Sequence, residues 1–93
     1  MVIRGLGPSL AGSLPNAMTD PTLELHNSNG VMQDFNNDWK DSQELQIEAA
    51  GLAPSKPQES AILTSLLPGN FTAILRGKDG TIGNALIEVY NIP

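Results

Sequence analysis

The residues best suited to chemistry lie between positions 34 and 48, where five acidic side chains accompany a single base. Asp34, Asn36 and Asp38 alternate along this stretch, which is the spacing by which calcium loops gather oxygen ligands, and Asp41 could add a fourth. The match to an EF-hand is partial, because the glycine of its sixth position and the glutamate of its twelfth are both missing. Two interpretations stay open: a calcium site made of these four residues, or a loop whose side chains make turn hydrogen bonds.

The same loop holds the only tryptophan of the chain, Trp39, directly after Asn36, Asn37 and Asp38. In sugar-binding modules an aromatic ring stacks on a pyranose while amides and carboxylates bind its hydroxyl groups. This combination predicts a carbohydrate site in the Asn36–Asp41 loop, formed by these four residues. The alternative is that Trp39 folds inward, because a chain with four aromatic residues needs the bulk in its core.

Groups able to catalyse a reaction are sparse. The absence of cysteine excludes a thiol nucleophile, a zinc-thiolate site and a disulfide framework, and His26 is the only histidine. The stretch from Gly7 to Ala11 differs from a nucleophile elbow by one glycine, with Ser9 as the nucleophile, but the fold built around that motif needs far more chain. Glu44 and Glu48 share one helical face, where a solvated surface is the simpler interpretation. We expect a protein that is not an enzyme, with no catalytic residue and no cofactor apart from the calcium considered above.

The length of 93 residues allows one domain, 1–93. The net charge of −5 argues against nucleic acid as a partner, since a binder needs a basic stripe. This charge is local: residues 34–48 carry −4 of it. No apolar run is long enough to insert into a membrane.

Short apolar runs between turn clusters predict an all-β fold: a mainly antiparallel, jelly-roll-like β-sandwich of about six strands with one short helix. Leu23 and Leu25 alternate with polar residues, and Asn29-Gly30 suits a tight hairpin turn. A capping box at residues 41–44 predicts the helix, which would run through Ala50 with Leu45 facing the core. The predicted strands are residues 1–6, 22–27, 31–35, 60–66, 70–76 and 85–92, the last three forming an antiparallel meander.

The order of these segments resembles a recurrent module found towards the C-terminal ends of large secreted proteins of environmental bacteria. The stretches that carry the resemblance are VIRGLGPSL (2–10), DPTLELHNSNG (20–30), FNNDWKD (35–41), GLAP (51–54), ESAIL (59–63), LPGNFTAILRGK (67–78) and GNALIEVYNI (83–92). The chain is also similar, more loosely, to bacterial pre-peptidase C-terminal domains. Both resemblances imply a β-sandwich attached to a larger protein, and neither supplies a catalytic residue.

The resemblance implies a non-enzymatic accessory or interaction module, located outside the cell or on its surface; the start of the chain lacks the pattern of a signal peptide. A carbohydrate-binding module, assisted by calcium, is the alternative. Members of the first family usually have another strand directly upstream of VIRGLGPSL, whereas this chain starts at Met1. We therefore expect an exposed strand edge near Met1–Leu6, through which a protein partner or a second copy pairs; the alternative is that this strand forms a protected edge.

Overall fold

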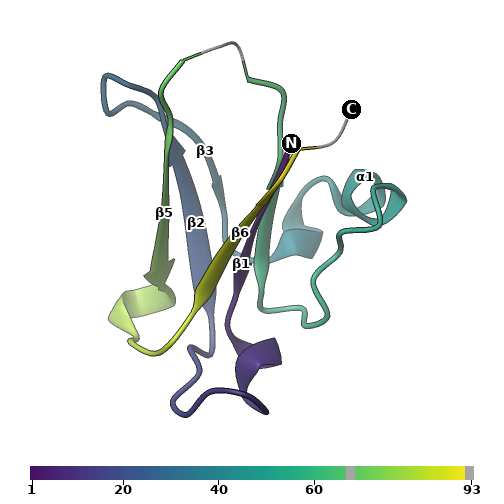
Figure 1. The fold of residues 1–93 in the computed structure, drawn as a ribbon, viewed down its shortest axis with the longest axis vertical. Helices are drawn as coiled ribbons and strands as arrows, with labels where there is room; N and C mark the ends of the chain where they lie inside the picture. The colour runs from purple at the N-terminus through teal and green to yellow at the C-terminus, as the bar shows by residue number, and fades with distance from the viewer. Residues whose placement is uncertain (67–68, 92–93) are drawn as a thin grey trace.

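The computed structural model describes residues 1–66 and 69–91, so Ile92 of the predicted strand 85–92 lies outside it. Most of the regular structure is strand, in two three-stranded antiparallel sheets with little helix, which confirms the prediction of an all-β fold (Figure 1). Within the described residues, no helix has both the length and the apolar character that crossing a membrane needs. The elements are β1 (Val2–Leu6), η1 (Pro8–Leu10), β2 (Pro21–His26), β3 (Met32–Asn36), η2 (Trp39–Asp41), α1 (Glu44–Ala49), β4 (Ser60–Leu63), β5 (Thr72–Gly77), η3 (Lys78–Gly80) and β6 (Leu86–Tyr90).

The first sheet has the strand order β4-β1-β6, so β1 lies in its centre. Ile3 of β1 lies opposite Ile62 of β4 on one side and opposite Val89 of β6 on the other. The prediction of an open edge near Met1–Leu6 is therefore wrong, as is the alternative of a protected edge strand there, because both sides of this strand are paired. In the described residues, β4 and β6 are the outer strands of the first sheet.

The second sheet has the order β3-β2-β5, which shows that β4, β5 and β6 do not form the predicted meander. Ala73 and Leu75 of β5 lie opposite Leu25 and Leu23 of β2, whereas β6 pairs with β1. Turn signals report where the chain reverses, but not which strand it pairs with afterwards. Here β5 crosses to the second sheet, where its apolar residues join those of β2.

The β2–β3 hairpin agrees with the sequence prediction. Glu24 pairs with Phe35 and His26 with Met32, and Gly30 adopts the positive φ of +77° that an L side chain rarely tolerates. Asn27 fixes the turn, because its Oδ1 accepts hydrogen bonds from the backbone N–H groups of Asn29 and Val31 at 2.9 and 3.0 Å.

The main apolar core lies between the two sheets. Ile3 and Ile62 from the first sheet and Leu23 and Leu25 from the second are buried in one cluster. They sit at alternate positions of their strands, so their side chains share the inner face. Half-buried apolar residues pack around them: Met1, Leu66, Phe71, Ala73 and Leu75.

A second apolar cluster covers the outer face of β4. Ala61 points away from the main core and packs with Trp39 and Ile47, all of them buried. The helix differs from the prediction: its N-cap is Gln43 in the left-handed region, with no side-chain cap, and Leu45 is 78% exposed. Ile47 supplies the core contact instead, because α1 presents it to β4.

Two amide side chains, Asn36 at the end of β3 and Gln43 directly before α1, bond to the outward backbone groups of β4. Gln43 Nε2 donates to the Leu63 carbonyl at 2.9 Å, and its Oε1 accepts from the Leu63 N–H at 3.2 Å. Asn36 Oδ1 accepts from the Ala61 N–H at 2.9 Å. The two amide side chains therefore replace a neighbouring strand, which protects this edge from pairing with another chain.

Candidate functional site

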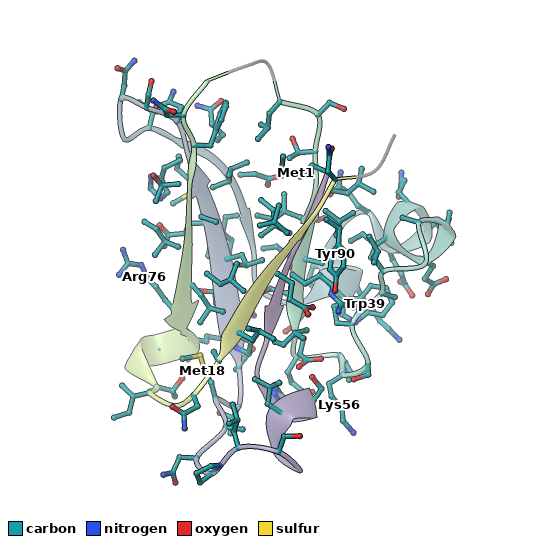
Figure 2. All side chains as sticks on the ribbon, viewed as in Figure 1. Met1, Met18, Trp39, Lys56, Arg76 and Tyr90 are labelled. Atoms are coloured by element: carbon teal, nitrogen blue, oxygen red, sulfur yellow. The ribbon has the colours of Figure 1, made fainter. Side chains whose placement is uncertain are left out.

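The predicted carbohydrate site is not open in the structure. Trp39 is only 5% exposed and lies on the α1 side of the first sheet, packed against Ile47 and Ala61 (Figure 2). Lys40 Nζ lies 5.5 Å from the centre of the indole rings. The ring has no free face on which a pyranose could stack, and its position matches the alternative interpretation of Trp39 as a core residue.

Asn36 is buried and joins two strands. Besides accepting from Ala61, it donates through Nδ2 to the Asp38 carbonyl at 3.0 Å. Asn37 and Asp38 are half-buried, and each has one buried side-chain oxygen without a partner among the described residues. The amide of Asn36 is thus occupied by the backbone of this chain and is not available to a ligand.

The four predicted calcium ligands do not come together. Asp34 is exposed on β3, where its Oδ1 accepts from the Phe35 N–H at 2.8 Å, and Asp41 is exposed in η2. Asn36 is occupied as described. Residues 1–66 and 69–91 contain no group of three or more histidine, aspartate or glutamate side chains arranged to hold a metal. An alternating pattern fails here because β3 is extended up to Asn36, and the rise of roughly 3.3 Å per residue in a strand keeps side chains at alternate positions too far apart to converge on one ion.

Asp20 lies directly before β2, at the end of the second sheet where Asp38 also lies. The sequence pattern did not single it out. Its pKa is raised, mainly by partial burial and then by the negative charge of Asp38, while Lys78 acts in the opposite direction. One of its carboxylate oxygens is buried without a partner in the described part of the chain. This end of the protein therefore concentrates negative charge at some cost to folding.

The serine, histidine and carboxylate groups that a hydrolase would need lie apart. Ser9 Oγ donates to Glu59 Oε2 at 2.6 Å, whereas the ring of His26 faces Glu24 and the Gly30 carbonyl. No hydrogen bond links Ser9 with His26 in the described residues. The resemblance to a nucleophile elbow therefore reflects a turn at the end of β1.

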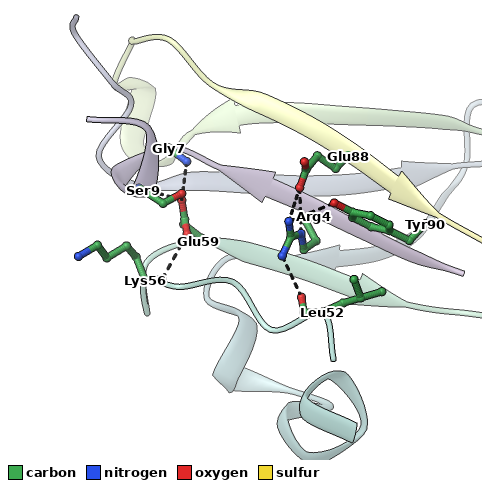
Figure 3. Close-up of polar contacts among 8 residues, drawn as sticks. All are labelled: Arg4, Gly7, Ser9, Leu52, Lys56, Glu59, Glu88 and Tyr90. Carbon is green, nitrogen blue, oxygen red and sulfur yellow. Dashed lines mark hydrogen bonds and ion pairs between the residues drawn. The ribbon is translucent and has the colours of Figure 1, made fainter. Parts of the chain in front are cut away.

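Glu59 is the most notable polar residue that the sequence did not reveal. Its side chain is fully buried and accepts four hydrogen bonds, which join the turn after β1 to the loop before β4 (Figure 3). Oε2 accepts from the N–H groups of Gly7 and Ser9 at 2.9 and 3.0 Å and from the Ser9 hydroxyl; Oε1 accepts from the Lys56 N–H at 3.2 Å. All four donors belong to this chain, so the carboxylate has a structural role.

Arg4 connects the first sheet to the segment that covers it. Its guanidinium pairs with Glu88, donates to the Leu52 carbonyl at 3.4 Å and to the Tyr90 hydroxyl at 3.2 Å, and lies over the tyrosine ring (Figure 3). Arg4 and Glu88 are thus paired with each other, and the described residues of β1 and β6 carry no unpaired charge on their outer face.

Glu24, His26 and Arg76 form a second ionic group, on the outer face of the second sheet. Glu24 lies 2.8 Å from His26 Nε2 and 3.1 Å from Arg76 Nε. The hydrogen bond with His26 and then Arg76 lower the pKa of Glu24, and the same bond, helped by the Gly30 carbonyl, raises the pKa of His26. Both ring nitrogens of His26 face acceptors, so only the protonated imidazolium satisfies both.

These shifts predict a pH window for stability. The raised pKa of His26 stabilises the fold below about pH 6.5, and this contribution is lost as the pH rises through the folded-state pKa. The lowered pKa of Glu24 stabilises the fold above about pH 4.5, and this contribution is lost as the pH falls. We expect the Tm difference between the wild type and His26→Gln to be largest between these values. Thermal unfolding from pH 3 to 9 measures it; a difference that is constant or grows above pH 8 contradicts the role of the ion pair.

One opening in the apolar surface lies between β5 and β6. Here a cavity of about 270 Å³ is lined almost wholly by apolar side chains from both sheets, among them Ile3, Leu25, Phe71 and Val89. We call this region, with the inward-facing residues Ala73 and Leu75 of β5 and Ile87 and Val89 of β6, the open cleft. The two strands that border it, β5 and β6, are labelled in Figure 1.

Comparison with known proteins adds no relative: no family model, no curated protein and no solved structure matches this chain.

Proposed function

We propose that the chain is a non-enzymatic interaction module of an extracellular bacterial protein, and that its two sheets form a β-sandwich, jelly-roll-like and open on one side. The resemblance of its sequence motifs to a module of large secreted proteins supports this assignment. The separation of Ser9 from His26, and the use of Glu59 within the chain, also favour a role without catalysis. In this proposal the open cleft is the surface that binds another polypeptide.

The observation that carries the proposal is the exposure of apolar residues that point toward the space between the sheets. Ile87 and Val89 lie opposite Gly5 and Ile3 of β1, and therefore face inward like Ile3. Nevertheless they are 38% and 58% exposed, whereas Ile3 is buried. Inward-facing aliphatic residues of β6 that remain exposed beside an apolar opening mark a binding surface.

Photo-crosslinking in cells that make the protein tests this proposal. A photoreactive phenylalanine analogue placed at position 89 lies in the open cleft, and the same analogue at position 45 replaces the exposed Leu45 on α1. We expect covalent adducts with a polypeptide from position 89 and none from position 45. Equal adducts from both positions, or none from position 89 in a variant whose Tm is unchanged, would contradict the proposed surface.

A further inference from the structure

The open cleft has a free strand edge along it. The Thr64 N–H donates to the Met1 carbonyl at 3.0 Å, and Glu59 accepts from the Gly7 N–H, so odd-numbered residues of β1 direct their backbone groups toward the β4 side. In an antiparallel ladder the direction alternates, so the even-numbered residues bond to β6. The backbone N–H and C=O groups of Ile87 and Val89 consequently point away from β1, toward the open side.

The two outer strands of the first sheet differ in whether side chains bond to their outward backbone groups. Along β4 the outward backbone groups of Ala61 and Leu63 are capped by the Asn36 and Gln43 side chains. Along β6 the described residues provide no such cap. The inward face of β6 carries no charge, proline or bulge of the kind that blocks pairing at natural sheet edges. The edge of β6 thus remains competent to bind a strand.

The side chains around the cleft indicate the chemistry of its occupant. The charged side chains of the two bordering strands, Arg76 and Glu88, lie on the outer faces and are paired with Glu24 and Arg4. The interior is apolar, and its cavity of about 270 Å³ accommodates aliphatic side chains. A complementary strand therefore carries no charge on its inward face and has an aliphatic residue at every second position.

A second copy of this chain fits less well. Pairing β6 with its symmetry mate would bury chiefly the exposed parts of Leu86, Ile87 and Val89. These amount to a few hundred Å², well below the roughly 800 Å² that each partner of a stable interface buries. An extended strand lying in the cleft instead contacts the edges of both sheets.

We propose that the open cleft binds an extended strand of a separate polypeptide, which pairs with the backbone of β6 and inserts aliphatic side chains from alternate positions between β5 and β6. This proposal rests on the proposed function, since it specifies the partner of the same surface. The bound strand completes the first sheet and covers Ile87 and Val89.

Titration of the full chain, labelled with ¹⁵N, with two capped synthetic peptides tests the mode of binding. The first, TKVTITVK, has aliphatic residues at alternate positions and both lysines on the opposite face; the second, TKTVIVTK, has the same composition and charge without the alternation. We expect the alternating peptide to bind at least tenfold more tightly, and to slow hydrogen exchange at the amides of Ile87 and Val89. Equal affinity, or binding without protection of these amides, overturns the strand-pairing proposal even where crosslinks from position 89 support the proposed function.

Two variants of β6 provide matched controls. Val89→Asp places a charge in the cleft and should weaken binding of the alternating peptide at least tenfold, whereas Leu86→Asp makes the same type of change on the outer face and should leave binding nearly unchanged. The Tm of each variant shows that it is folded. Sedimentation of the protein alone tests whether a second copy of this chain occupies the cleft instead. A dimer in which the Ile87 and Val89 amides are already protected would overturn the proposal.

Discussion

Replacing Glu59 by glutamine is expected to destabilise the fold by about 3 kcal/mol, because a buried carboxylate with four donors would become an amide that accepts through one oxygen only. The amide nitrogen of glutamine would face N–H donors or the Ser9 hydroxyl. Each donor left in the interior without an acceptor has lost its hydrogen bonds to water with no replacement, which destabilises the folded state. For a chain of this length, the loss corresponds to a fall in Tm of more than about 10 °C.

Thermal and urea unfolding of three variants measure this effect. Glu48→Gln makes the same chemical change at an exposed position of α1 and should leave the stability within about 0.5 kcal/mol of the wild type. Ser9→Ala removes only the hydroxyl donor to Glu59 Oε2 and should cost about 1 kcal/mol. A Glu59→Gln protein as stable as Glu48→Gln would show that the four hydrogen bonds do not hold this end of the sheet together.

The sequence predicted features that depend on neighbouring residues. The alternation of Leu23 and Leu25 identified an inward face, and both side chains are buried. Asn29-Gly30 identified the hairpin, since only a residue that tolerates positive φ suits that turn. The one tryptophan belongs to the core for the reason given above: with few aromatic residues, the fold needs its volume.

Features that depend on distant residues were not predictable in the same way. Glu59 looks like an ordinary surface acid, and only the turn after β1, about fifty residues earlier, gives its carboxylate three of its four donors. Gln43 was assigned to a helix start, but its amide bonds to Leu63 across the edge of β4. The placement of β1 in the centre of its sheet, and hence of the free edge at β6, follows from pairings between strands far apart in the sequence.

Adding a single methyl group to Gly7 is expected to be the most damaging small change in the turn after β1. A Cβ atom at this position would overlap the backbone carbonyl oxygen of Met18 and press on the Pro21 ring. The Met18 carbonyl belongs to the backbone and the Pro21 ring is rigid, so neither can move away without disturbing the turn, in which the Gly7 N–H also donates to Glu59. We therefore expect Gly7→Ala to lower the free energy of unfolding by about 3 kcal/mol or more, which is comparable to the largest single-residue effects in domains of this size.

Gly12→Ala is the matched control, because a Cβ atom there meets no heavy atom within 4 Å, and Gly12 does not have a positive φ. Because alanine reduces the conformational freedom of the unfolded chain, this variant should be as stable as the wild type or more stable by up to about 1 kcal/mol. Urea unfolding of both variants decides the role of the glycine-rich turn. If Gly7→Ala were as stable as Gly12→Ala, the close approach of Met18 would not be what requires glycine at position 7. A large difference between the two would instead explain this motif by packing at the end of β1, with no need for a nucleophile at Ser9.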